Sequence, residues 1–134
     1  MPLLLAFSVA EFAIGACGVF SLHVFKAAGA AMSGGSLLQT AAVCFGLLLV
    51  PTLFMGSTLP LLVTHHVRSI GNVGRSVSWL YFINTLGAAV GCLVAALLCL
   101  AFFGMKTTVY VAAGLNGVAA LLMLLNWMRE RRAA

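Results

Sequence analysis

Few side chains in this sequence are suited to acid–base or metal chemistry, and most of them stand alone. Only two residues are acidic, Glu11 and Glu130. Glu11 lies within an apolar stretch, and carboxylates in such surroundings often mark routes for protons or cations across membranes. Two amides, Asn84 and Asn116, interrupt other apolar stretches in the same way. These three residues form the candidate polar route.

The remaining chemistry-bearing residues do not combine into a catalytic, cofactor or metal site. The two glutamates are far apart in the sequence, which argues against a paired-carboxylate site. His65 and His66 are adjacent, so on a helix they would point about 100° apart instead of toward one ion; we expect them in a solvated loop. The four cysteines form no C-x-x-C pair and fit small packing positions; they are Cys17, Cys44, Cys92 and Cys99. Glycine-rich phosphate-binding motifs are also missing. The sequence therefore indicates no catalytic residue, no cofactor and no metal.

Composition defines the class of protein that must position these groups. Hydrophobic residues make up 63% of the 134 residues and charged residues 7%, which is typical of an integral membrane protein. A membrane-spanning helix needs about 20 apolar residues. Four runs meet this length, at residues 3–25, 37–62, 78–103 and 107–127. The first run lacks the basic start of a secretory signal, so we interpret it as a retained helix. We predict an all-α fold of four transmembrane helices in a single membrane domain, 1–134, with a basic loop at 63–77 and a basic tail at 128–134.

The basic residues predict an orientation. Five arginines fall in the loop and the tail, and two lysines fall in the other connections; the arginines are Arg68, Arg75, Arg129, Arg131 and Arg132, and the lysines are Lys26 and Lys106. Cytoplasmic segments carry the excess of Lys and Arg, so both termini are predicted to be cytoplasmic. The net charge of +5 is then a topology signal and gives no reason to expect nucleic acid as a partner.

Three of the predicted helices carry a face of small residues with one strongly polar group. The sets are Ser8, Glu11, Gly15 and Gly18; Asn84, Ala88, Gly91 and Ala95, with Gly87 and Gly91 as a G-x-x-x-G pair; and Ala113, Asn116 and Ala120. Small residues allow membrane helices to approach closely, so these faces are predicted to look inward. Asn84 and Asn116 then either hydrogen-bond between helices, at about 0.6 kcal/mol each, or line a route.

The second predicted helix contains two prolines. Proline removes a backbone donor and clashes with the preceding turn, so we expect a kink near Pro51. The segment around Gly56 and Pro60 is expected to be locally unwound, with hydroxyls such as those of Ser57 and Thr58 bonding the freed carbonyls.

The pattern of glycine and polar residues resembles a known family. The segment Gly56 to Leu62, the motif L-Y-x-x-N-T-x-G-A-x-x-G at 80–91 and the end of the last helix, A-A-x-L-N at 112–116, resemble the membrane domain of the fused spermidine synthase-like family. In those bacterial proteins a major-facilitator-like helical region precedes an aminopropyltransferase domain. The resemblance covers the third to sixth helices of that region, so it implies synthase activity only for a partner or an assembled complex.

The expected function follows from this resemblance. The chain is predicted to be a membrane subunit or partial module in the bacterial inner membrane, multi-pass, which completes a helical bundle with other transmembrane subunits and handles a small cationic metabolite such as a polyamine. One partner is expected to carry a cytoplasmic synthase-like domain. Two alternatives remain open: a structural anchor of a larger membrane complex, and a small homodimeric exporter.

Overall fold

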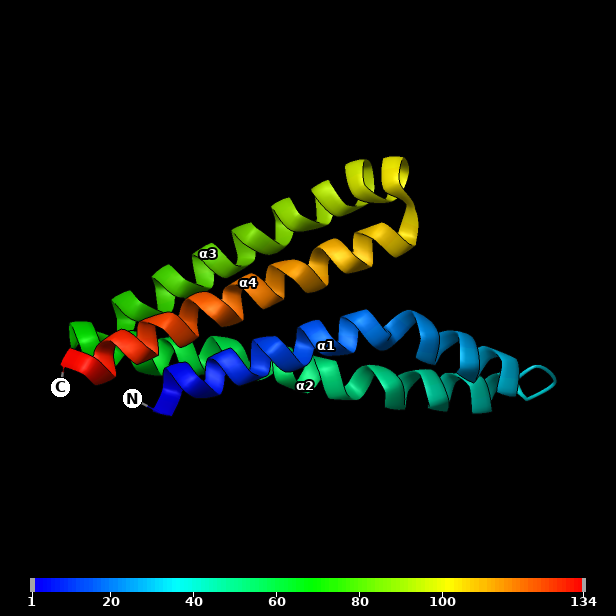
Figure 1. Cartoon of the computed structure of the whole chain (residues 1–134), viewed down its shortest axis with the longest axis horizontal. Coiled ribbons are helices and arrows are strands. Elements are labelled where there is room, and N and C mark those ends of the chain that lie inside the picture. The colour runs from blue at the N-terminus through cyan, green and yellow to red at the C-terminus, as the bar shows by residue number, and fades with distance from the viewer. Residues whose placement is uncertain (1, 134) are drawn as a thin grey trace.

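The computed structural model describes residues 2–133, and these residues are almost entirely helical (Figure 1). The elements are α1 (Pro2–Ala31), α2 (Leu37–Ile70), α3 (Val73–Val94), the π-helix η1 (Ala95–Phe103) and α4 (Gly104–Ala133). No strand occurs among the described residues. The predicted all-α class is therefore confirmed.

The connection between α1 and α2 is short because the sequence supplies a strong helix start. Ser36 precedes α2 in an extended conformation, and its hydroxyl accepts a hydrogen bond from the backbone N–H of Gln39 at 3.3 Å. The backbone N–H of Ser36 in turn donates to Oε1 of Gln39 at 3.0 Å. This reciprocal pair satisfies two of the free donors at the helix N-terminus.

The predicted basic loop at 63–77 is wrong, because α2 continues to Ile70 and α3 begins at Val73. Only Gly71 and Asn72 separate the two helices. Gly71 adopts the left-handed conformation (φ 75°), and its N–H donates to the carbonyl of Val67 at 2.8 Å. Asn72 then accepts a hydrogen bond from the backbone of Arg75 at 3.0 Å. Glycine ends a helix in this way, and asparagine begins one.

The expected unwinding at Pro60 is also wrong. Both Pro51 and Pro60 lie inside α2, which stays helical throughout. Ser57 and Thr58 donate to carbonyls one turn earlier in the same helix, those of Phe54 and Met55. The chain therefore passes both prolines without leaving the helical path.

The helix ends also differ from the predicted runs. α1 extends to Ala31 instead of residue 25, and α4 includes the predicted tail as far as Ala133. Charged residues ended the apolar runs, but arginine and glutamate are good helix formers. The helices are therefore longer than the hydrophobic segments.

A sharp reversal separates α3 and η1 from α4. Gly104 has φ 72° and ψ 173°, a combination that is nearly restricted to glycine. Figure 1 shows the chain turning back at this point, so that α3 with η1 and α4 run in opposite directions. The preceding nine residues of η1 form a π-helix, which is unusually long for this rare element.

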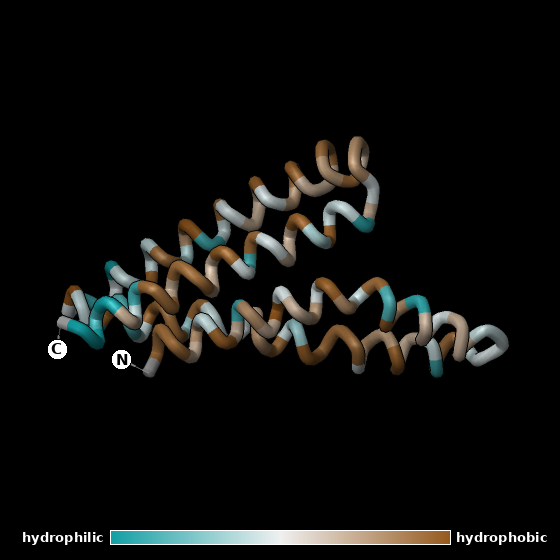
Figure 2. The backbone as a smooth tube through the Cα atoms, in the orientation of Figure 1, coloured by the Kyte–Doolittle hydropathy of each residue, from teal (hydrophilic) through white to brown (hydrophobic). Residues whose placement is uncertain are grey.

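The core lies between α1 and its two neighbours. α1 packs against α4 on one side and α2 on another, whereas α3 contacts α2 near the turn and then continues into η1. The buried apolar side chains are Leu4, Phe7, Ala10, Ile14, Ala113 and Ala120. Most large apolar side chains are exposed, and Figure 2 shows hydrophobic residues along the length of every helix.

Three helical segments are long and apolar enough to cross a membrane by length and composition. They are Leu3–Ala31, Leu37–Ile70 and Val73–Arg132. The third includes the reversal at Gly104. Exposed apolar helices of this length indicate a lipid bilayer as the environment.

Candidate functional site

The polar and small faces of α1 and α4 pack against each other. Ser8 is buried and donates a hydrogen bond from Oγ to the carbonyl oxygen of Ala120 at 2.7 Å. A Cβ added at Gly15 would lie 3.1 Å from the carbonyl oxygen of Ala113, and one added at Gly18 would lie 3.3 Å from the Cβ of the same alanine. The backbones therefore approach closely, as small residues permit in membrane helices.

Asn116 lies beside this contact. Its Cβ is 3.5 Å from the position that a Cβ would occupy at Gly15, and the residue is partly exposed. The inward orientation predicted for the small faces of the first and last helices is therefore found. No hydrogen bond from the Asn116 amide is formed within residues 2–133, so the amide has capacity left for another group.

Glu11 lies on the inner face of α1 without a partner in the described part of the chain. The four residues one turn away on either side, Phe7, Ser8, Ile14 and Gly15, are all buried, while Glu11 itself is partly exposed. Neighbours at this spacing share a helix face. No hydrogen bond or ion pair reaches its carboxyl group from residues 2–133. Sequence periodicity placed Glu11 on this face correctly.

A groove opens between α1, α2 and α4. It has a volume of about 600 Å³. Its lining is mainly apolar and includes the polar residues Ser21 and Asn116 together with Cys17 and Pro51. Glu11 and Asn84 do not line it. The groove therefore contains one of the three candidate route residues.

Asn84 is placed away from the other two candidates. It is exposed on α3, which has no contact with α1 or α4. A Cβ added at Gly87 or Gly91 would meet no atom within 4 Å. No other described segment covers the small-residue face of α3, contrary to the packed, inward position that we predicted for it.

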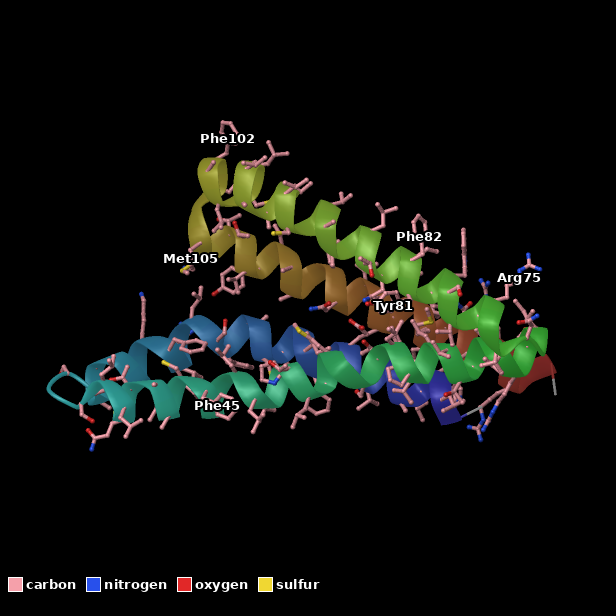
Figure 3. The ribbon with its side chains drawn as sticks, turned by 180° about the vertical axis from the view of Figure 1, so that it is seen from behind. Phe45, Arg75, Tyr81, Phe82, Phe102 and Met105 are labelled. Atoms are coloured by element: carbon pink, nitrogen blue, oxygen red, sulfur yellow. The ribbon has the colours of Figure 1, made fainter. Side chains whose placement is uncertain are left out.

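Large apolar side chains on α2, α3 and η1 also point away from the ribbon. Figure 3 shows this for Phe45, Phe82 and Phe102, and Phe102 is 75% exposed. The remaining glycine of the predicted packing set, Gly56, has open space beside it. The outer surfaces of these helices are thus available to lipid or to other helices.

The two histidines occupy α2 and not the loop predicted for them. His65 Nε2 lies 3.7 Å from a carboxylate oxygen of Glu130, which joins the C-terminal parts of α2 and α4. His66 Nδ1 lies 3.0 Å from the hydroxyl of Ser76 at the start of α3. The two rings serve different neighbours, as their adjacency predicted. The contact with Ser76 was missed, although the Gly71–Asn72 pair is a sequence signal for a tight turn that brings these helices together.

The arginines gather at one end of the molecule. Arg68 and Arg75 flank the turn between α2 and α3, and Arg129, Arg131 and Arg132 lie in the last turns of α4. Figure 2 shows the hydrophilic residues concentrated at this end, where both termini lie. The Arg131 guanidinium stacks over the Trp127 ring at 4.8 Å. Trp and Arg are typical of helix ends at a membrane surface.

Three or more His, Cys, Asp or Glu side chains do not meet anywhere in residues 2–133 in a group that could hold a metal ion. Comparisons of the chain with models of protein families, with curated proteins and with solved structures give no match. None of these comparisons links the chain to the spermidine synthase-like family, which was inferred from sequence motifs.

Proposed function

We propose that this chain is an incomplete membrane module, which crosses the bilayer four times and completes a helical bundle with helices from partner chains. The observation that carries the proposal is the uncovered face of α3. Asn84 is exposed there without a hydrogen-bond partner in residues 2–133, next to the open surfaces of Gly87 and Gly91. Lipid offers an amide no partner, so burial of such a group without one is costly. A second helix would supply both the close packing and the hydrogen bond.

The reversal at Gly104 supports four crossings instead of three. It divides the long apolar segment Val73–Arg132 into two parts that run in opposite directions. Each part has about 30 residues, which at 1.5 Å per residue is about 45 Å and exceeds the hydrocarbon thickness. With the five arginines at one end, the positive-inside rule favours that end, and both termini, on the cytoplasmic side.

The resemblance to the spermidine synthase-like family supports a bacterial inner membrane location and a small cationic metabolite as the ligand of the completed module. In this proposal Glu11 and Asn116, on adjoining helices, contribute to the route from within the chain. Asn84 joins them only through the partner, because α3 does not contact α1 or α4. An aminopropyltransferase-like activity would belong to a partner domain.

A site-specific photo-crosslinking experiment tests the proposal. A benzophenone side chain is placed at Ala88, on the Asn84 face of α3, and in a control variant at Leu93, on the opposite face. After irradiation of the native membrane, the adducts are identified by mass spectrometry. Adducts with another membrane polypeptide from position 88, and only lipid from position 93, support the module. Equal labelling of lipid from both positions would reject it.

The identity of the crosslinked chain separates the alternatives. Adducts made only of two copies of this chain favour the homodimeric exporter. If another polypeptide is found, Glu11→Gln then separates a conduit from an anchor. A conduit assembles normally but takes up less spermidine, used here as the cationic probe. An anchor assembles normally with unchanged uptake.

A further inference from the structure

A second hollow lies at the turn between α2 and α3, apart from the groove described above. Its volume is about 430 Å³. His66 and Ile70 line it from α2, and Arg75, Ser78 and Trp79 line it from α3. Ile70 follows His66 by four positions, and Ser78 and Trp79 follow Arg75 by three and four, so the residues on each helix lie near one face. The Gly71–Asn72 turn brings the two faces together. We call this the turn pocket.

The His66 ring is held in place at one side of the turn pocket. Its Nδ1 lies 3.0 Å from the hydroxyl of Ser76, and Ser76 is completely buried. A serine hydroxyl can donate to this nitrogen or accept from it. When the hydroxyl donates, the ring proton resides on Nε2, which is then a hydrogen-bond donor. The contact thus fixes the ring plane and leaves Nε2 free for a ligand.

The charge of the turn pocket is positive. Arg75 contributes a permanent guanidinium charge with a planar set of donors, which suits phosphate geometry. Only two side chains in the sequence are carboxylates. Glu11 is on α1, and Glu130 lies beside His65 instead of His66. Among residues 2–133, no carboxylate side chain lines the turn pocket to neutralise Arg75.

The apolar residues of the turn pocket indicate a ligand that has an apolar part beside its polar part. Ile70 and Trp79 are 47% and 55% exposed, beside the polar groups of Arg75 and Ser78. The turn also belongs to the arginine-rich end of the molecule, where Figure 3 labels Arg75 on the first part of α3. Basic and aromatic side chains together are typical of the headgroup level of a membrane.

We propose that the turn pocket binds a phosphate group, carried either by an anionic lipid headgroup or by a free phosphorylated molecule. Arg75 and Nε2 of His66 contact the phosphate oxygens, the Ser78 hydroxyl adds a third donor, and Trp79 covers the adjoining apolar part. This site is formed by one copy of the chain and does not depend on partner helices.

Native mass spectrometry of the purified full-length chain tests the site. The protein is equilibrated in detergent with equal amounts of phosphatidylglycerol and phosphatidylcholine, and separately titrated with inorganic phosphate. The matched pair of variants is Arg75→Gln and Arg68→Gln. Both remove one charge at the same end, but Arg68 does not line the turn pocket. Circular dichroism and gel filtration confirm that each variant is folded.

The expected result is preferential retention of phosphatidylglycerol or binding of inorganic phosphate, weakened about tenfold by Arg75→Gln and unchanged by Arg68→Gln. Retention of the lipid without phosphate binding identifies the headgroup as the source. Phosphate binding without lipid preference identifies a soluble source. Equal weakening by both variants would mean unspecific charge attraction and would overturn the proposal, as would the absence of both kinds of binding in the unmodified protein.

Discussion

Ser8 Oγ donates a hydrogen bond of 2.7 Å to the carbonyl oxygen of Ala120, across 112 positions of the chain. This bond joins the first part of α1 to the second half of α4 and is buried between them. It lies in the same interface as the close approach of Gly15 to Ala113. The packing of α1 on α4 can therefore be tested at two neighbouring points.

Replacing Ser8 by alanine removes the hydroxyl and its bond to α4. Hydrogen bonds between membrane helices contribute about 0.6 kcal/mol on average and at most about 1.7 kcal/mol. The free energy of unfolding should therefore decrease by an amount of this size. Reversible unfolding in mixed micelles provides the measurement. Ser21→Ala is the matched control, because the Ser21 hydroxyl bonds only to the Gly18 carbonyl of its own helix. Equal losses for the two variants would contradict the role assigned to Ser8.

Gly15→Ala should destabilise the protein more than a single hydrogen bond does. The new methyl group would lie 3.1 Å from the Ala113 carbonyl oxygen, and overpacking of this kind costs about 1–3 kcal/mol. The same unfolding assay measures it. Gly29→Ala, on the same helix but with open space around it, should cause no loss. A neutral Gly15→Ala variant would mean that α1 and α4 separate easily.

Gly104→Ala tests the reversal between η1 and α4. A side chain at φ 72° and ψ 173° is strained by about 1–3 kcal/mol, so the variant should unfold more readily or lose the reversal. Gly114→Ala in α4, where a Cβ meets nothing, provides the comparison. Reversal is monitored by the distance between spin labels at Leu93 and Leu115, and an unchanged stability and distance would argue against a special role for Gly104.

The proposed topology predicts which positions are accessible from each side. In a variant without native cysteines, Ser33→Cys and Lys106→Cys should react with a membrane-impermeant maleimide on intact cells. Ser69→Cys and Arg132→Cys should react only after the membrane is opened. Labelling of Lys106→Cys and Arg132→Cys from opposite sides is the essential result, because α4 must then cross the bilayer by itself. Labelling of both from the same side would rule out four crossings.

Much of the helical framework could be predicted because the length of an apolar run and the spacing of its residues are local properties of the sequence. The inward faces of α1 and α4 followed from Ser8 and Gly15 at one end of the chain and Ala113 and Ala120 at the other. The tight turn at Gly71 was missed because the charged residues around it were interpreted as part of a longer loop. The Gly71–Asn72 pair indicates such a turn, since glycine often ends one helix and asparagine often begins the next.

The candidate site was predicted only in part. Periodicity shows which residues share a face of a helix, but not which helix covers that face. Glu11 lies on the packed side of α1, and Asn116 of α4 lies next to that side. Asn84 is uncovered because α3 contacts neither α1 nor α4. The π-helix η1 could not be predicted, because an apolar run composed mainly of alanine, leucine and phenylalanine does not distinguish π-helical from α-helical hydrogen bonding.

The central position of α1, between α2 and α4, has a consequence for biosynthesis. α1 is translated before the other described helices, and it packs against α4, which is translated after them. At about 5–20 residues per second, the 112 residues that separate Ser8 from Ala120 take roughly 6–22 s to translate. During this interval the Ser8 hydroxyl lacks the Ala120 carbonyl oxygen, its hydrogen-bond acceptor in the folded chain. The packing of α1 against α4 can therefore form only after the helices between them have been synthesised.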